Sequence, residues 1–298
     1  MLNMSENSIL EKLKSNKKGL FYSLECKPNL NDNFNLVRDS LNSFNLMFAS
    51  TPWHLRKGIY NVKYLEPLAI AKTFQKHGIT ALLHLSATGM KKTNVKEVLK
   101  LAKEAGIKNI FALQGDRTFD SPPSDFPHAY DLVKYIRENF KNTFTIGVGG
   151  YPRGHCDSTS YKDDLNFLKA KVDAGADFII TQMFFEAEDF IKYVKDCRKI
   201  GVNVPIIPGV FTIQNMESLE FVARFCRVGV PQKMLSEIEL LKSEEQILNY
   251  GIKTSVNIIK EIIDAGINVR GIHFFTLNKY KPSYEVKKQI EEFISKKS

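Results

Sequence analysis

The chain of 298 residues has few cysteines, and their spacing fits no shared site. Cys26, Cys156, Cys197 and Cys226 lie far apart without a C-x-x-C pair, and the six histidines are dispersed. This pattern argues against a disulfide framework and against the usual zinc motifs. We therefore expect free thiols, no metal site and a reducing, cytoplasmic environment.

Long apolar runs and the common nucleotide motifs are also missing. No stretch approaches the ~20 apolar residues that a membrane span needs, and the N-terminus has neither a signal core nor the composition of a transit peptide. The segment 147–154, GVGGYPRG, lacks G-x-G-x-x-G and runs into Pro152 instead of a helix. It is therefore not a dinucleotide fingerprint. We expect a soluble protein without a membrane span.

The net charge of +9 raises the question of nucleic-acid binding. The lysines, however, are interleaved with glutamates in helical patterns, as in residues 91–106 and 281–297. Such a pattern is typical of a solvated helix face, and no zinc-finger, KH or RRM signature accompanies it. We expect no nucleic-acid partner, although a basic surface attracts anionic small molecules.

A helix–glycine–strand pattern recurs along the chain. A hydrophobic content of 43% with 21 Phe is ample for a large core. Several amphipathic segments end at a glycine that is followed by an apolar run, at Gly78, Gly106, Gly175, Gly201 and Gly266. Glycine tolerates the left-handed backbone that ends a helix. Each unit therefore fits one step of a parallel α/β sheet.

Eight strand-like runs predict a (β/α)8 TIM barrel. They span residues 20–26, 46–51, 81–87, 109–116, 144–151, 178–185, 204–211 and 269–278. The segment 212–266 is longer than one crossover, so we expect extra helices before the last strand. No linker or low-complexity segment interrupts the pattern, and we expect a single domain over residues 1–298.

Polar residues end most of these runs. They are Glu25, Thr51, Ser86, Asp116, Tyr151 with His155, Gln182, and Asn278 with Lys279. Alone, each is more often a strand-end cap, but in a barrel they converge on the mouth where the chemistry lies. Glu25 and Asp116 are carboxylates in apolar surroundings. One could donate a proton while the other stabilises charge, and spacing does not say which.

Seven segments together carry a family resemblance. In order they are LECKPN, ALQGD, GYPRGH, KVDAGADFIITQMFFE, IIPGVFTIQ, NYGIKTSV and HFFTLNK. From about residue 20 to about 285 they resemble the catalytic barrel of methylenetetrahydrofolate reductase, without the regulatory domain that follows it in animal members. The resemblance implies a flavoprotein of one-carbon metabolism. It would pass hydride from NADH or NADPH through FAD to 5,10-methylenetetrahydrofolate, giving 5-methyltetrahydrofolate.

The resemblance also implies roles for individual residues. Glu25 matches the family's acid, and Asp116 matches an aspartate between flavin and pterin. Gln182 matches a glutamine that binds folate, and Lys279 stands where a basic residue suits the folate's glutamate tail. The positions implied for FAD are Thr51, His84, Gly115, Asp116, Ala129, Tyr151, His155, Asp164 and Lys171.

Several positions depart from the family pattern and leave alternatives open. Cys26 and Lys27 replace residues of the usual Glu-Phe-Phe-Pro-Pro segment, and Gln114 replaces an arginine beside the flavin. Phe167 and Ala170 occupy positions that can contact the cofactor in some members. A flavin-free barrel serving as a subunit of a larger assembly is therefore an alternative to the enzyme. A lyase using Lys27 or Lys171 is a more distant one. The sequence does not decide whether the reductant is NADH or NADPH, or whether the protein is a homo-oligomer or a monomer.

Overall fold

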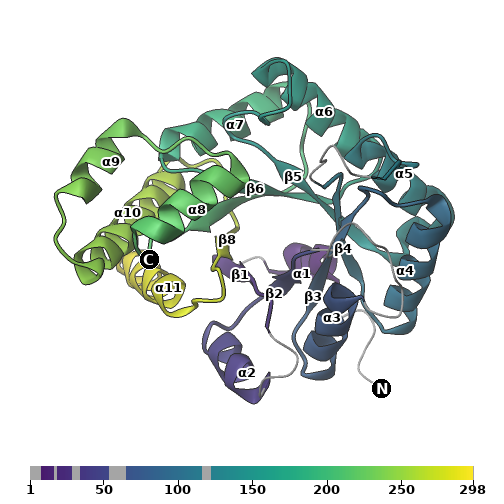
Figure 1. Ribbon diagram of the computed structural model, residues 1–298, viewed down its shortest axis with the longest axis horizontal. Helices are drawn as coiled ribbons and strands as arrows, with labels where there is room; N and C mark the ends of the chain where they lie inside the picture. Colours follow the sequence, from purple (N-terminus) through teal and green to yellow (C-terminus); the bar gives the residue numbers. More distant parts are fainter. Residues whose placement is uncertain (1–7, 17–18, 29–33, 54–64, 116–121, 298) are drawn as a thin grey trace.

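Parallel strands close into a barrel in the computed structural model, which describes residues 8–16, 19–28, 34–53, 65–115 and 122–297. Within these residues there are eight strands, β1 Phe21–Glu25, β2 Phe48–Thr51, β3 Ala81–Ser86, β4 Asn109–Leu113, β5 Thr145–Gly150, β6 Phe178–Met183, β7 Ile206–Phe211 and β8 Gly271–Phe275. Each pairs in parallel with its sequence neighbours, and β8 pairs with β1 to close the ring (Figure 1). The predicted (β/α)8 fold is confirmed.

Helices alternate with the strands and surround them (Figure 1). The α-helices are α1 Ile9–Ser15, α2 Phe34–Ser43, α3 Glu66–Lys76, α4 Lys92–Glu104, α5 Ala129–Phe140, α6 Tyr161–Asp173, α7 Ala187–Lys199, α8 Met216–Cys226, α9 Gln232–Glu239, α10 Glu244–Asp264 and α11 Lys281–Lys297, with a 3-10 turn, η3, at Lys141–Thr143. The extra helices expected before the last strand are α8 to α10. The five helix-ending glycines all have positive φ, from +64° to +114°. That there is a single domain over residues 1–298 stays a prediction.

Two strands, β4 and β8, end three residues earlier than the apolar runs indicated, and the other strand ends differ by two residues or fewer. Strand β4 ends at Leu113, not at Asp116, and Asp116 itself lies outside the described residues. Strand β8 ends at Phe275, where the predicted run continued to residue 278. In the turn after β8, Leu277 and Asn278 have φ of +47° and +62°. Left-handed backbone cannot continue a strand, so regular pairing stops before these residues.

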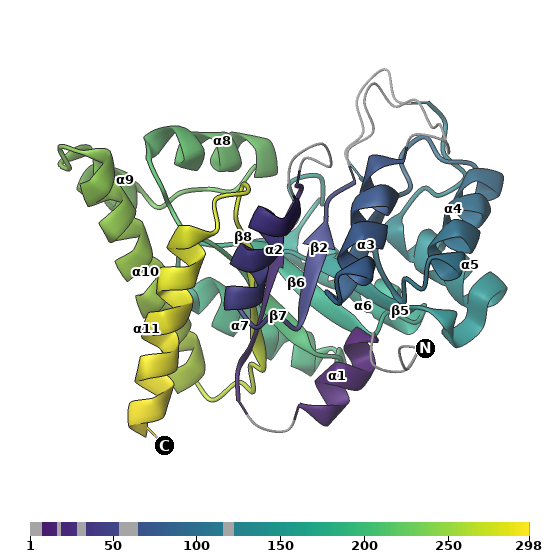
Figure 2. The same ribbon diagram turned by 90° about the horizontal axis from the view of Figure 1, so that it is seen from below.

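The sheet separates an outer from an inner core cluster, and a third cluster packs α8 and α9 against the ends of β6 and β7. The outer one packs the strands against the helices. The inner one lies inside the barrel and joins strand residues such as Phe21, Phe48 and Phe178 to Ile9 and Leu13 of α1. Figure 2 shows α1 at the end of the barrel opposite α8. This short helix therefore plugs the amino-terminal end of the barrel, a role that we did not predict from the sequence.

Polar contacts hold the plug in place. The backbone N–H of Ile9 donates to Asn109 Oδ1 at 2.8 Å, and Lys12 Nζ donates to Thr80 Oγ1 at 2.7 Å. These partners begin β4 or just precede β3, so α1 is tied to the strand beginnings. The opposite, carboxyl-terminal end is the one left for ligands, as in other barrels of this kind. Among the described helices, none combines the length and the apolar composition needed to cross a membrane.

Removing the plug's side chain from the inner core should destabilise the barrel. Leu13 is only 2% exposed, so Leu13→Ala should lower the free energy of unfolding by ~2–5 kcal/mol. Lys14→Ala, an exposed position on the same helix, should change it by less than ~0.5 kcal/mol. Urea unfolding of the two variants measures the difference. Equal effects would mean that α1 is not part of the folded core.

Candidate active site

Strand alternation directs Glu25 into the mouth of the barrel. On β1, Phe21 packs in the inner cluster, and Ser23 Oγ lies 3.0 Å from Nδ1 of His273, which is also inside the barrel. Successive side chains alternate between the two faces of a strand. Glu25 is thus the third inward position and the one nearest the open end.

The surroundings of Glu25 favour its protonated form. The side chain keeps partial solvent exposure at the mouth, yet burial raises the pKa of its carboxyl to about 7. Desolvation disfavours the charged carboxylate, and no charged neighbour among the described residues offsets it. A carboxyl with this pKa holds a proton in about half of the molecules at neutral pH, which suits a general acid.

Below Glu25, the middle of the barrel carries a neutral polar layer. Burial, with a smaller contribution from His84, lowers the pKa of His273 to about 3. His84 itself is buried on β3 with its ring 4.8 Å from that of Phe111. His84 thus lies inside the barrel, and its contact with a ligand stays a prediction.

Gly115 follows β4 in a conformation that few other residues adopt. Its φ is +81°, and an added Cβ would fall 1.9 Å from Ser86 Oγ. Ser86 and Thr88 both donate hydrogen bonds to the carbonyl of Gln114, at 3.3 and 2.7 Å. The absent side chain of Gly115 therefore leaves room for Ser86, which the sequence placed at the mouth without a specific role.

A second group of predicted residues forms a connected cluster beside β5. Lys171 on α6 donates from Nζ to the carbonyl of Gly149 at 2.6 Å and lies 5.6 Å from the ring centre of Tyr151. The rings of Tyr151 and His155 meet edge to face at 4.5 Å. Asp164, also on α6, completes the group through its charge interactions with Lys171 and His155.

Burial shifts both charged members of this cluster toward neutrality. It lowers the pKa of Lys171 to about 8, while the Asp164 carboxylate acts in the opposite direction. Burial also raises the pKa of Asp164, and Lys171 and His155 counter that rise. Among the described residues, Asp164 Oδ2 has no hydrogen-bond partner although it is buried. A buried acceptor of this kind is costly unless a ligand or water satisfies it.

A cavity of about 610 Å³ adjoins this cluster. It lies between the start of α5 and α6, next to the predicted position Ala129, and its walls are Tyr130, Asp157, Ser158, Thr159, Asp163, Asn166, Phe167 and Ala170. The Phe167 ring is 43% exposed and stacks on that of His128 at 5.5 Å. The volume falls within the ~300–1,000 Å³ of typical ligand sites.

The remaining predicted positions are more dispersed. Gln182 on β6 accepts a hydrogen bond from the N–H of Met183 through Oε1 at 2.9 Å, and Lys279 is exposed in the turn after β8. Thr51 ends β2, where it shares the strand parity of Ala49, a member of the outer core. Its buried Oγ1 has no partner among the described residues. By alternation, Thr51 is thus directed away from the mouth.

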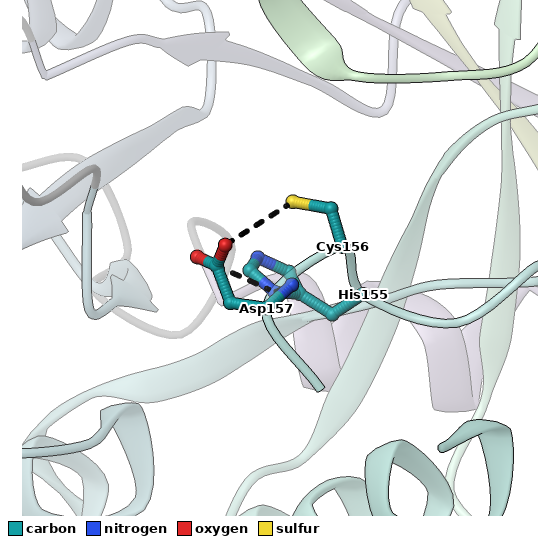
Figure 3. Close-up of side chains that lie close together, drawn as sticks. All are labelled: His155, Cys156 and Asp157. Carbon is teal, nitrogen blue, oxygen red and sulfur yellow. Dashed lines mark hydrogen bonds and ion pairs between the residues drawn. The ribbon is translucent and has the colours of Figure 1, made fainter. Parts of the chain in front are cut away.

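The loop after β5 holds a further group that the sequence did not single out. His155, Cys156 and Asp157 offer ligand atoms within 4.8 Å of one another (Figure 3). However, the Asp157 N–H donates to His155 Nδ1 at 3.1 Å, and Arg227 Nη1 donates to Asp157 Oδ1 at 2.8 Å. Arg227 Nη1 also donates to Cys156 Sγ at 3.3 Å, so all three groups already have protein partners. That the chain holds no metal stays a prediction.

Comparison with known proteins identifies the family. The family model for methylenetetrahydrofolate reductase matches residues 11–291. This chain belongs to the methylenetetrahydrofolate reductase family. It is 35% identical to a probable methylenetetrahydrofolate reductase (NADPH) of Caenorhabditis elegans, over 92% of this chain and 42% of that protein. It is 36% identical to methylenetetrahydrofolate reductase (NADH) 1 of Arabidopsis thaliana, over 67% and 36%. The chain thus spans less than half the length of these relatives.

A solved structure shares the fold at low sequence identity. It is a protein from Clostridium thermocellum that binds two copies of 5-methyl-5,6,7,8-tetrahydrofolic acid. The TM-score is 0.67 at 15% identity, over 96% of this chain and all of that one. This likeness supports the barrel assignment independently of the family model.

The five positions that depart from the resembled family pattern lie in two parts of the barrel. Phe167 and Ala170 both line the cavity beside α6, and Gln114 follows β4, where its carbonyl accepts the bonds from Ser86 and Thr88. The acid side differs at Cys26 and Lys27, but Glu25 itself is kept. Two of the five positions, Phe167 and Ala170, thus contribute side chains to the wall of a cavity.

The short distance between the Gly115 backbone and Ser86 allows a prediction about stability. Gly106 has a similar φ of +74° but nothing within 4 Å of an added Cβ. Gly106→Ala should therefore cost only the backbone strain of ~1–2 kcal/mol. Gly115→Ala should cost ~1 kcal/mol more, because Ser86 must turn away and lose its hydrogen bond. Chemical unfolding of both variants gives the comparison, and equal losses would show that Ser86 moves freely.

Proposed function

We propose that this barrel reduces 5,10-methylenetetrahydrofolate to 5-methyltetrahydrofolate, with FAD as cofactor and NADH or NADPH as reductant. The observation that carries the proposal is Glu25, an inward-facing carboxyl at the mouth of a barrel of this family, with its pKa raised to about 7. The folate bound by the structural neighbour supports the substrate class.

The residues beside β5 and α6 fit a flavin nucleotide. Lys171 provides a buried cation for a phosphate, and Asp164 provides a buried acceptor that no described residue satisfies. The neighbouring cavity is lined by aromatic rings, by hydroxyl and amide groups and by the carboxylates of Asp157 and Asp163, the first of which is paired with Arg227. The rings, hydroxyls and amides are the groups that bind the flat rings and the polar parts of a nucleotide. Tyr151, His155 and Ala129 complete the set that we assign to FAD.

In this proposal Glu25 supplies the proton of the reaction. FAD, if held by the residues beside β5 and α6, would supply hydride transfer between the nicotinamide and the folate's one-carbon unit. Opening the folate's five-membered ring requires protonation of an amine nitrogen, which a neutral carboxyl can perform. Glu25 is then left as a carboxylate and regains a proton from solvent, to which it is partly exposed.

Three other residues would hold and stabilise the folate. Gln182 lies on β6 with an amide suited to the pterin ring, and Lys279 presents an exposed cation to the acidic tail. Asp116, outside the described residues, would stabilise positive charge on the folate as it accepts hydride. A preorganised group of this type is typically worth ~3–4 kcal/mol.

The uncharged side chains of Phe167 and Ala170 in the cavity wall favour an alternative function, that of a flavin-free binding subunit. Ala170 and Phe167 offer no charge to a cofactor, and Phe167 packs its ring on His128. A barrel that has given up the flavin and serves as a binding subunit of a larger assembly would show this pattern. Fold alone does not decide between these functions.

Flavin binding separates the two proposals. The purified protein should be yellow or should bind added FAD in titration. Lys171→Met should weaken that binding by ~10-fold or more, because it removes a charge-assisted contact of over 1 kcal/mol. Lys169→Met, on the same helix but outside the cluster, is the control. A colourless protein that takes up no FAD at high concentration would favour the binding subunit.

The role of Glu25 is tested by separating the two half-reactions. Glu25→Gln should slow folate reduction by ~100-fold or more, since general acid catalysis contributes that much. Flavin reduction by the nicotinamide should change little. In the parent protein the folate step should slow as pH rises through about 7, because the carboxyl loses its proton.

Stopped-flow absorbance follows both half-reactions of that test. Glu66→Gln is the control, since Glu66 lies near the mouth in an ion pair with Lys27 at 3.0 Å. Equal loss of both half-reactions in Glu25→Gln would indicate a structural role for the carboxyl.

A further inference from the structure

Side chains in the turn after β8 form hydrogen bonds with the backbone of the segment that contains Glu25. Thr276 Oγ1 donates to the carbonyl of Glu25 at 2.8 Å. The amide of Asn278 makes two bonds with Lys27, accepting from its N–H through Oδ1 and donating to its carbonyl from Nδ2, both at 2.8 Å. We name this set of contacts, from Thr276 and Asn278 to Glu25 and Lys27, the clasp.

The clasp begins where regular strand pairing stops. Between β1 and β8 the register runs from Phe21↔Gly271 to Leu24↔Phe274 and goes no further. On the other side, Glu25 still pairs with Ser50 of β2, and the Cys26 N–H donates to the Ser50 carbonyl at 2.9 Å. On the β8 side, Glu25 therefore depends on the clasp.

Asn278 is chemically suited to this position. Its φ of +62° is left-handed, which asparagine and glycine tolerate better than other residues. Its amide carries both a donor and an acceptor, so it can bond the N–H and the carbonyl of one residue as a neighbouring strand would. Thr276 supports the same turn by accepting from the Asn278 N–H at 3.1 Å.

We propose that Asn278 and Thr276 are positioning residues, which hold Glu25 in the mouth and thereby limit its contact with water. The clasp replaces the missing backbone pairs on the β8 side of Glu25, so loosening it gives the carboxyl more freedom to reach solvent. The catalytic meaning of this inference rests on the proposed function. The expected change in the proton affinity of Glu25 is independent of that function.

Apart from Lys279, an exposed cation in the same turn, the described groups around the clasp are neutral or paired. A cation would lower the pKa of Glu25, so solvent exclusion is the effect that keeps this pKa raised. The described titratable groups near the clasp are Cys26, Lys27, Glu66, His273, Lys279 and Tyr280. Burial raises the pKa of Cys26 to about 12, and its thiol contacts the hydroxyl of Tyr280, whose pKa burial also raises. Lys27 is paired with Glu66, and His273 is neutral at pH 7.

The test removes the clasp without adding charge. Asn278→Gly keeps a residue that accepts the left-handed backbone and deletes the amide. Thr276→Val deletes the hydroxyl that bonds the Glu25 carbonyl, and Thr276→Ser restores it. Asn268→Gly is the matched control, because Asn268 is an exposed asparagine with φ of +57° just before β8, at the other end of the strand.

The readout is the titration of Glu25 itself in the protein without folate. Carboxyl-labelled glutamate followed by 13C NMR, with Glu25→Gln to assign the signal, gives the midpoint. In Asn278→Gly and Thr276→Val we expect the midpoint to fall by ~1 pH unit or more toward that of an ordinary glutamate, because the charged form gains hydration. Thr276→Ser and Asn268→Gly should titrate like the parent protein.

Kinetics provide the second readout. In the folate half-reaction of the clasp variants, the fall in rate with rising pH should move to lower pH by the same amount. Unchanged midpoints in folded Asn278→Gly and Thr276→Val, whatever their melting temperatures, would overturn the inference and leave the clasp structural. A shifted midpoint in a protein that reduces no folate would support the clasp and reject the proposed function.

Discussion

Pairing between the first and the last strand is the constraint on which the rest of the structure depends. Four residue pairs from Phe21↔Gly271 to Leu24↔Phe274 close the ring. The closure requires glycine at 271, since a Cβ there would lie 2.2 Å from the Phe21 ring. Because all strands run in one direction, closure gathers their carboxyl ends into a single mouth. Glu25 and Lys279, distant in sequence, therefore belong to the same end of the barrel.

The interior changes character from one end of the barrel to the other. At the amino-terminal end α1 and the inner phenylalanines exclude water. In the middle, Ser23 and His273 form a polar contact whose histidine stays neutral because it is buried. At the open end, burial raises the pKa of Glu25 to about 7. The same desolvation thus favours the neutral form of both groups, the imidazole in the middle of the barrel and the carboxyl at its mouth.

Local signals predicted the strands and helices, while contacts between distant segments escaped prediction. The helix-ending glycines and the apolar runs are properties of short segments, and they located all eight strands and the helices before β8. The plug role of α1 depends on Leu13 meeting strands that come later in the chain. The clasp joins Asn278 to Lys27 across 251 positions. The ends of β4 and β8 were placed too late because left-handed residues that follow them leave no mark in hydrophobicity. Glu25 was placed at the mouth because the end of an apolar run is itself a local signal, and Asp116 lies outside the described residues.

The two sides of the mouth are held by different kinds of interaction. On the acid side, hydrogen bonds from Thr276 and Asn278 bind backbone atoms, so the side chains of Cys26 and Lys27 can change while the main-chain bonds persist. On the α6 side, the cavity is shaped by the side chains that line it, Phe167 and Ala170 among them. Substitution there alters the cavity directly and leaves the barrel hydrogen bonds intact. Affinity for a ligand in this cavity can therefore change while the position of Glu25 is kept, because the backbone hydrogen bonds that hold Glu25 do not depend on the side chains of Cys26 and Lys27.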